Sequence, residues 1–216
     1  MATNNVGHKI VLTSDRTLMS EYNGGIFLGF SACVPHGLLP DSIYFSLFCP
    51  SVPILNMGYK REDIIVAHPD KLEKVVGSNT KILCISENDP LGMGPATTTF
   101  RQLFNGEAYM TIKLKEILNN SAVQKYKPKI VIGGAGAWQL ENSEVRKTLG
   151  IDCVVIGEGE SVIGPLFKRA FDGESFPEVV QGQIVETPDI PLIADVTIDG
   201  IVEIARGCGR GCAFCV

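Results

Sequence analysis

Residues 128 to 134 read PKIVIGG, a short run of apolar residues that ends in two glycines. Similar runs recur along the chain as KIVLT (9–13), DIIVAH (63–68), TKILCIS (80–86) and DCVVIGEGE (152–160). Continuous apolar runs of this length, bounded by polar or glycine residues, are typical of parallel strands that are covered on both faces. The runs therefore predict the strands of a parallel sheet.

Helical patterns alternate with these runs. PDKLEKVVG (69–77) has a proline at its start and a glycine past its end, and YMTIKLKEIL (109–118) places its apolar residues on one face. ESVIGPLFKRAFDG (160–173) has an apolar face as well, and it stops at Gly173. This alternation predicts a doubly wound α/β domain of the Rossmann or flavodoxin type, with a mostly parallel sheet, over residues 1 to 175.

The pattern changes between residues 176 and 200. Pro177, Pro188 and Pro191 exclude a long helix in this stretch, which is predicted to hold a strand or two and an extended connector. It leads into IVEIA (201–205), which alternates apolar and polar residues and predicts another short strand.

Composition excludes several classes of protein. With 45% hydrophobic and 20% charged residues, the 216-residue chain can bury a core, and its net charge of −5 provides no basic surface for nucleic acid or an anionic membrane. No apolar run is long enough to span a bilayer, and the polar N-terminus lacks a signal peptide. Seven cysteines without a secretion signal favour a reducing compartment, so the sequence predicts a cytoplasmic protein. Four of the cysteines lie in apolar stretches and are interpreted as small buried residues: Cys33, Cys49, Cys84 and Cys153.

The remaining cysteines, Cys208, Cys212 and Cys215, form a C-x3-C-x2-C run in a glycine-rich loop. This spacing lets one short loop direct three thiolates at a common centre, as iron–sulfur or zinc sites require. Three other interpretations remain open. A structural zinc site lacks a fourth ligand nearby, a disulfide would leave one cysteine over, and unrelated surface cysteines rarely show this spacing.

The stretch CGRGCAFC (208–215) resembles the cluster-binding loop of the radical S-adenosylmethionine (radical SAM) enzymes. The resemblance implies that the three cysteines bind three irons of a [4Fe–4S] cluster, whose fourth iron takes the amino and carboxylate groups of S-adenosylmethionine. It also implies that Phe214 lies near the adenine. The reaction of the family is reductive cleavage of S-adenosylmethionine to a 5′-deoxyadenosyl radical.

The body of the chain is similar to the N-terminal cobalamin-binding-like domain of one radical SAM subfamily. The resembling stretches are GGAGAWQL (133–140), CVVIGEGE (153–160) and EIARGCGRGCAFC (203–215), and two others look like a largely archaeal branch: TSDRTLMSEYNG (13–24) and DPLGMGPATTTF (89–100). The resemblance makes cobalamin a candidate cofactor and methyl transfer a candidate reaction. None of His8, His36 and His68 fits the Asp-x-His-x-x-Gly pattern of a cobalt ligand, so each is interpreted as a surface or capping residue.

Glycine-rich turns follow several of the predicted strands, and ligands of open α/β sheets bind at the carboxyl ends of strands. Threonines 97 to 99 add hydroxyl groups or a helix cap. The candidate cofactor-binding residues in these turns are Asp89, Gly92, Gly94, Thr97, Thr98, Gly133, Gly134, Gly157, Glu158, Gly159 and Glu160. The turns fit a cobalamin rim and plain connections equally well.

Residues 201 to 216 are predicted to be the first strand and cluster loop of a radical SAM domain whose barrel is missing. The chain is therefore expected to be the N-terminal part of a larger enzyme, inactive alone, with the missing barrel as its partner in cis and no catalytic residue assigned. The alternative is a stand-alone module that binds cobalamin or a nucleotide, or docks a partner, and carries a vestigial cysteine tail.

Overall fold

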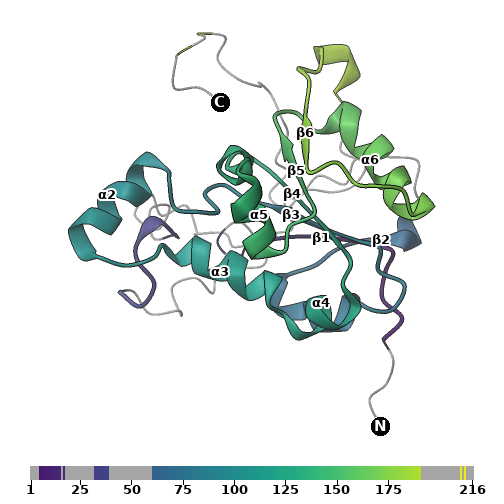
Figure 1. Cartoon of the computed structure of the whole chain (residues 1–216), viewed down its shortest axis with the longest axis horizontal. Coiled ribbons are helices and arrows are strands. Elements are labelled where there is room, and N and C mark those ends of the chain that lie inside the picture. Colours follow the sequence, from purple (N-terminus) through teal and green to yellow (C-terminus); the bar gives the residue numbers. More distant parts are fainter. Residues whose placement is uncertain are drawn as a thin grey trace.

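The computed structural model describes residues 5–15, 17, 32–38, 60–190, 210 and 212. Within these residues the strands form one sheet in which every neighbouring pair is parallel (Figure 1). Along the sheet, the order is β2 (Ile64–Val66), β1 (Ile10–Ser14), β3 (Ile82–Ser86), β4 (Lys129–Gly133), β5 (Cys153–Ile156) and β6 (Val179–Gln181). The five predicted strands are confirmed, and the protein is a doubly wound α/β domain.

Helices connect the strands. The α-helices are α1 (Leu72–Val75), α2 (Pro95–Phe104), α3 (Tyr109–Leu118), α4 (Ser121–Tyr126), α5 (Ser143–Leu149) and α6 (Glu160–Asp172). Of these, the structure adds α2, α4 and α5 to the three predicted from the sequence. Short 3₁₀ turns lie at η3 (Arg61–Asp63), η4 (Pro69–Lys71), η5 (Ala137–Leu140) and η6 (Thr187–Asp189). The helix predicted over 69–77 is divided between η4 and α1, and the Nδ1 of His68 caps η4 by accepting the amide of Asp70 at 3.2 Å. The capping role of His68 is thus confirmed.

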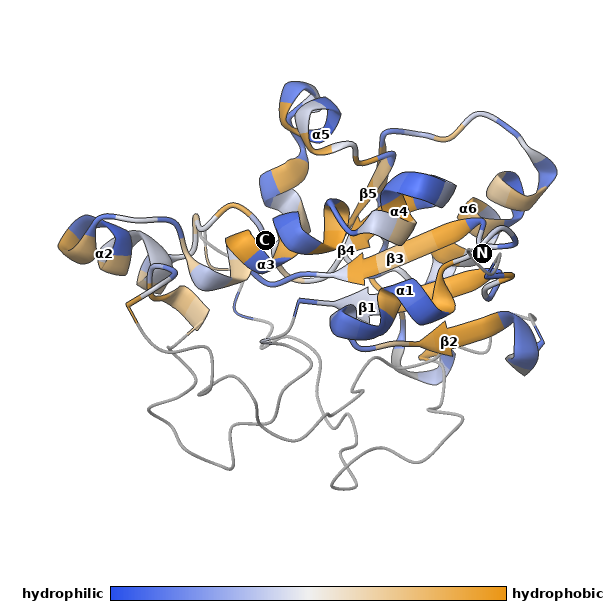
Figure 2. Cartoon of the chain, turned by 90° about the horizontal axis from the view of Figure 1, so that it is seen from below, coloured by the Kyte–Doolittle hydropathy of each residue, from blue (hydrophilic) through white to orange (hydrophobic). Residues whose placement is uncertain are grey.

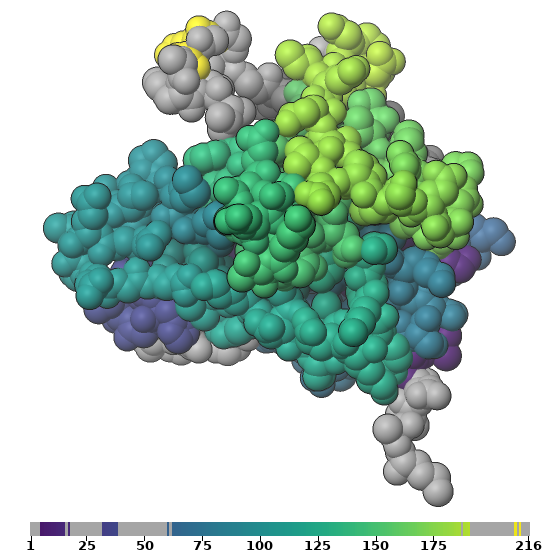
Figure 3. All heavy atoms as spheres, in the orientation of Figure 1, coloured from purple at the N-terminus to yellow at the C-terminus, as the bar shows by residue number. Residues whose placement is uncertain are grey.

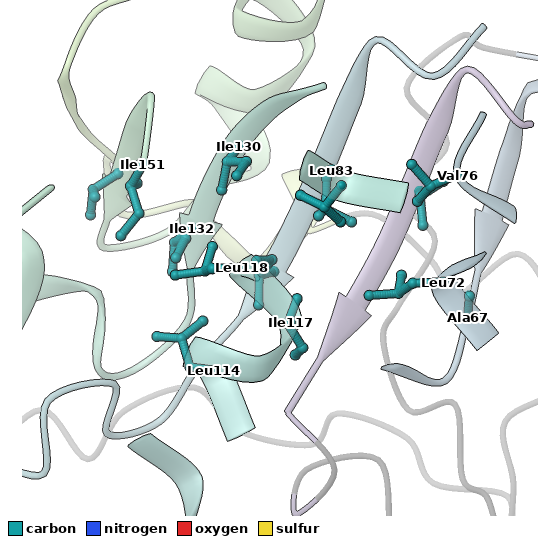
Figure 4. Packing of buried hydrophobic residues seen from close by; sticks show 14 of the residues in the cluster. Ala67, Leu72, Val76, Leu83, Leu114, Ile117, Leu118, Ile130, Ile132 and Ile151 are labelled. Atoms are coloured by element: carbon teal, nitrogen blue, oxygen red, sulfur yellow. The ribbon is translucent and has the colours of Figure 1, made fainter. Parts of the chain in front are cut away.

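Both faces of the sheet are buried, which explains why most residues of its central strands are apolar (Figure 2). In β3, Leu83 and Ile85 belong to the core on one face, whereas Ile82 and Cys84 belong to the core on the other. The first core lies under α1, α3, α4 and η5 (Figure 4), and the second lies under α6, whose Phe167 is fully buried. Helices on both faces leave only the strand ends accessible to a ligand.

The sheet extends beyond residue 175, where the sequence placed the end of the domain. β6 pairs in parallel with β5, and Glu178 just before it accepts a hydrogen bond from Arg146 at 2.6 Å. One strand of the predicted connector is therefore an edge strand of the domain. The strand predicted at IVEIA lies outside the described residues.

The buried cysteines behave as small core residues. Cys153 is fully buried, Cys84 is packed against the same core, and Cys33 packs against Ala32 and Met110. Burial, followed by the charge of Asp152, raises the pKa of the Cys153 thiol to about 12, so it stays protonated and unreactive. The prediction is confirmed for Cys153, whereas Cys33 and Cys84 are half-buried at the margins of their cores, and Cys49 lies outside the described residues.

α2 projects from one end of the body (Figure 3), where Leu103 and Phe104 are exposed. Among the described residues, none of the helices is both long enough and apolar enough to cross a membrane.

Candidate functional site

The strand order reverses between β1 and β3, because the chain runs from β1 outward to β2 and then returns to β3 on the opposite side. In open α/β sheets, such a reversal leaves a crevice at the carboxyl ends of the strands, where ligands bind. A cavity of about 240 Å³ lies at this edge on the face covered by α6. The fold therefore places a hollow where a doubly wound domain is expected to bind its ligand.

The wall of the cavity is mainly apolar. It is made by residues that four neighbouring strands and α6 contribute to the second core: Leu12, Cys84, Val131, Val155, Ile163 and Phe167. Ligand pockets in proteins usually measure about 300–1,000 Å³, and this cavity, at about 240 Å³, is smaller. It suits one flat apolar group of a larger molecule whose polar part remains at the rim.

Five of the predicted cofactor-binding residues meet at this rim. Gly133 ends β4 and Gly134 follows it, Gly157 and Gly159 connect β5 to α6, and Glu160 begins α6; all five line the cavity. Ser86, at the end of β3, lies beside them. Turns that are separate in the sequence thus contribute to one site.

Gly133 and Gly134 differ in whether their positions can take a side chain. Gly134 has a φ of 97°, and a Cβ atom there would lie 2.6 Å from the carbonyl oxygen of Glu87. A Cβ on Gly133 would meet only the carbonyl oxygen of Val155, at 3.8 Å, and would extend a side chain from a residue that lines the cavity. The backbone conformation and the close contact with Glu87 therefore require glycine at position 134 but not at position 133.

The loop after β3 is separate from the cavity and is organised by Asp89. This buried carboxylate accepts the amides of Met93 at 2.7 Å and Gly94 at 3.0 Å, the side-chain amide of Gln139 at 2.7 Å, and the hydroxyl of Thr97. Both carboxylate oxygens of Asp89 therefore accept hydrogen bonds from groups of the protein itself.

Of the two roles considered for threonines 97 to 99, hydroxyl groups or a helix cap, the helix cap is wrong. Gly94 is the N-cap residue of α2, and the threonines follow within the helix. The hydroxyls of Thr98 and Thr99 both donate to the carbonyl oxygen of Pro95. Proline at the first helical position and Asp89 reaching back from the loop define this helix start instead.

The remaining candidates also lie away from the cavity lining. Gly92 has a φ of 67° in the turn of the same loop, and Arg101 donates to its carbonyl oxygen at 3.3 Å. The Oε2 atom of Glu158 accepts the amide of Val185 at 2.7 Å and so attaches the segment after β6. Asp89, Gly92, Gly94, Thr97, Thr98 and Glu158 thus shape the loops around the site.

Sequence reasoning missed a pair of carboxyl groups at the same edge of the sheet. Asp15 and Glu87 directly follow β1 and β3, and the register pairs Ser14 with Ser86, so the two acidic residues are neighbours. Both are fully buried. The available signal was an acidic residue immediately after each of two central strands.

Most of the predicted cluster loop lies outside the described residues, including Cys208, Phe214 and Cys215. Cys212 is described and is half-buried. The described part of the chain contains no group of three His, Cys, Asp or Glu side chains that could hold a metal ion. The cluster site stays a prediction from the sequence.

Comparisons of the chain with protein-family models, with curated proteins and with solved structures gave no match in any of the three. Functional proposals for this protein therefore rest on its own residues.

Proposed function

We propose that the α/β domain binds cobalamin at the carboxyl edge of its sheet, and that Cys208, Cys212 and Cys215 bind the [4Fe–4S] cluster of a radical SAM enzyme. The observation that carries the first part is the cavity at the strand-order reversal, which five predicted rim residues line. The second part rests on the cysteine spacing.

The residues of the cavity fit part of a cobalamin molecule. Its apolar wall suits the flat base of the nucleotide tail, and at Gly133, where a Cβ atom would meet only the carbonyl oxygen of Val155 at 3.8 Å, a ligand can approach the backbone closely. Cobalamin, when bound, supplies a cobalt centre able to carry a methyl group. The described histidines are engaged elsewhere: His8 contacts the carbonyl oxygen of Glu62, His36 stacks on Tyr109, and His68 caps η4. The proposal therefore assigns no histidine to cobalt.

Gly133→Val tests the cavity. Valine is favoured in strands, and its Cβ has room at this position, so the free energy of unfolding should change by less than about 1 kcal/mol. Its methyl groups would occupy the space proposed for the base. We expect the Kd for hydroxocobalamin to rise at least about tenfold, a loss of about 1.4 kcal/mol. Titration of the fluorescence of Trp138, the single tryptophan, would measure it.

Thr99→Val is the matched control, because it introduces the same side chain on α2, outside the residues that line the cavity. It should bind hydroxocobalamin as the unmodified chain does. A cavity that plays no part in binding would give equal affinity in all three proteins. Absence of hydroxocobalamin binding to the unmodified chain would reject the cobalamin proposal itself.

The donor set of the cysteine loop fits an iron–sulfur cluster. Three thiolates in one loop match the soft ligands that such clusters require, and they leave one iron open to a substrate. The cluster, when bound, supplies the electron for cleavage of S-adenosylmethionine. The role of the chain is to supply the thiolates and, through Phe214, one face for the adenine.

Cys208→Ala should abolish the iron content and the charge-transfer absorption that the unmodified chain acquires on anaerobic reconstitution with iron and sulfide. Cys84→Ala serves as the control, since Cys84 lies in the wall of the cavity and is not expected to bind iron. Equal iron binding by both variants would show that the three-cysteine assignment is wrong.

A further inference from the structure

Two fully buried carboxyl groups lie next to each other where the strand order reverses. Asp15 and Glu87 each follow a central strand, and the pairing of Ser14 with Ser86 places them side by side. Two unit charges a few ångströms apart in a dry interior repel each other strongly, so such a pair cannot carry two negative charges at ordinary cost.

The surroundings distinguish the two groups. The Oδ1 atom of Asp15 accepts the backbone amide of Thr17 at 2.7 Å and also its hydroxyl, and these donors favour the ionised form of Asp15. Among the described residues, no N–H or hydroxyl group donates to either carboxyl oxygen of Glu87, whose side chain interacts with that of Asp15. Burial, and next the charge of Asp15, raise the pKa of Glu87 well above its usual 4.5. Glu87 is therefore the group that retains a proton.

We propose that Asp15 and Glu87 share one proton, and that this proton fastens the rim of the cavity to β3. Removing it would place a second negative charge in the buried pair. Glu87 would then have to move its carboxylate toward water, and its backbone would move with it. The inference rests on the fold and on this pair, and it stands whether or not the cavity binds cobalamin.

The backbone of Glu87 is the attachment point of the rim. Its amide donates to the carbonyl oxygen of Gly133 at 2.9 Å, and its carbonyl oxygen accepts the amide of Gly136, also at 2.9 Å. Gly134 packs so closely that a Cβ there would lie 2.6 Å from the same carbonyl oxygen. Displacing the Glu87 backbone therefore displaces the turn that contains two residues of the rim.

Asp89 is a third acidic residue near Glu87. The charge of Asp89 also raises the pKa of Glu87, and in the described part of the chain no basic side chain forms an ion pair with Glu87. A proton fits the site between the two carboxyl groups better than a divalent cation does, because no third carboxylate, His or Cys in the described residues completes a metal site.

The proposal predicts the direction in which folding stability depends on pH. Above its usual pKa of 4.5, the Glu87 carboxyl is ionised in the unfolded chain but still protonated in the folded chain. The folded state then binds more protons, so stability falls as pH rises until the folded-state pKa is reached. Glu87→Gln keeps an N–H donor for Asp15 and removes this titration.

The experiment compares urea unfolding of the unmodified chain and of Glu87→Gln at successive pH values above 4.5. We expect the folding constant of the unmodified chain to fall, relative to the variant, by up to about tenfold per pH unit. Glu141→Gln, at an exposed position, is the control and should run parallel to the unmodified chain. Parallel curves for Glu87→Gln would overturn the proposal.

Nuclear magnetic resonance supplies a second measurement on the unmodified chain, which remains decisive if Glu87→Gln does not fold. The ¹³C-labelled carboxyl of Glu87 should titrate well above 4.5, and the amides of Gly134 and Gly136 should shift with the same midpoint. Titration near 4.5 would refute the shared proton. Glycine amides that do not follow the carboxyl would refute its link to the rim. A stability gain on adding Mg²⁺ that Glu87→Gln abolishes would replace the proton with a metal ion.

Discussion

Replacing Asp89 with alanine is expected to lower the free energy of unfolding by about 3–5 kcal/mol, because it removes a buried charge that holds four donors. The amides of Met93 and Gly94, the side chain of Gln139 and the hydroxyl of Thr97 all donate to this carboxylate. Alanine would leave all four donors without this acceptor. Chemical denaturation followed by circular dichroism measures the loss.

Asp172→Ala is the control for this prediction. Asp172 is paired with Lys168 one turn away on the exposed side of α6. An exposed pair of this kind contributes about 0.3–0.5 kcal/mol, so the control should change little. If Asp89→Ala cost no more than Asp172→Ala, the four donors would have to be satisfied by other means, and Asp89 would not be the centre of the loop.

Gly134→Ala is expected to cost about 2–5 kcal/mol, from the sum of two separate effects. The first is the backbone, because a φ of 97° is unfavourable for a residue with a side chain. The second is contact, because the new Cβ would lie 2.6 Å from the carbonyl oxygen and 2.8 Å from the nitrogen of Glu87. The rim turn would move away from β3, so affinity for hydroxocobalamin should fall as well.

Gly150→Ala separates the two effects. Gly150 ends α5 with a φ of 72°, and nothing lies within 4 Å of the Cβ that alanine would add. The backbone effect alone should cost about 1 kcal/mol there. The difference between the two variants measures the contact with Glu87. Equal losses would mean that the rim turn and β3 are not in close contact.

These variants also bear on how the cavity is supported. Asp89 binds Gln139 of η5, and Gly134 packs on Glu87, so both hold the turn between β4 and η5 against the end of β3. The buried pair of Asp15 and Glu87 lies at the same edge. Perturbing any of them should therefore alter the rim before it alters the cores under the helices.

The sequence by itself determined the strands of the central sheet and the positions of α3 and α6. Apolar runs such as TKILCIS and PKIVIGG predicted the strands because burial on both faces of a parallel sheet selects for apolar residues at every position. The periodicity of residues 109–118 predicted α3 with the correct boundaries. Glycines next to the predicted strand ends indicated the edge of the sheet at which the cavity lies. These features follow from local patterns that a reader of the sequence can recognise.

Only the tertiary structure decided which of those residues act together. In the folded protein one cavity is lined by Gly133, Gly134, Gly157, Gly159 and Glu160. Asp89 and Thr97 instead hydrogen-bond to each other and hold a loop. The tertiary structure also made residues 179 to 181 an edge strand and placed Asp15 beside Glu87. The order and register of strands arise from contacts between residues far apart in the chain, and no local pattern records which strand end will lie next to which.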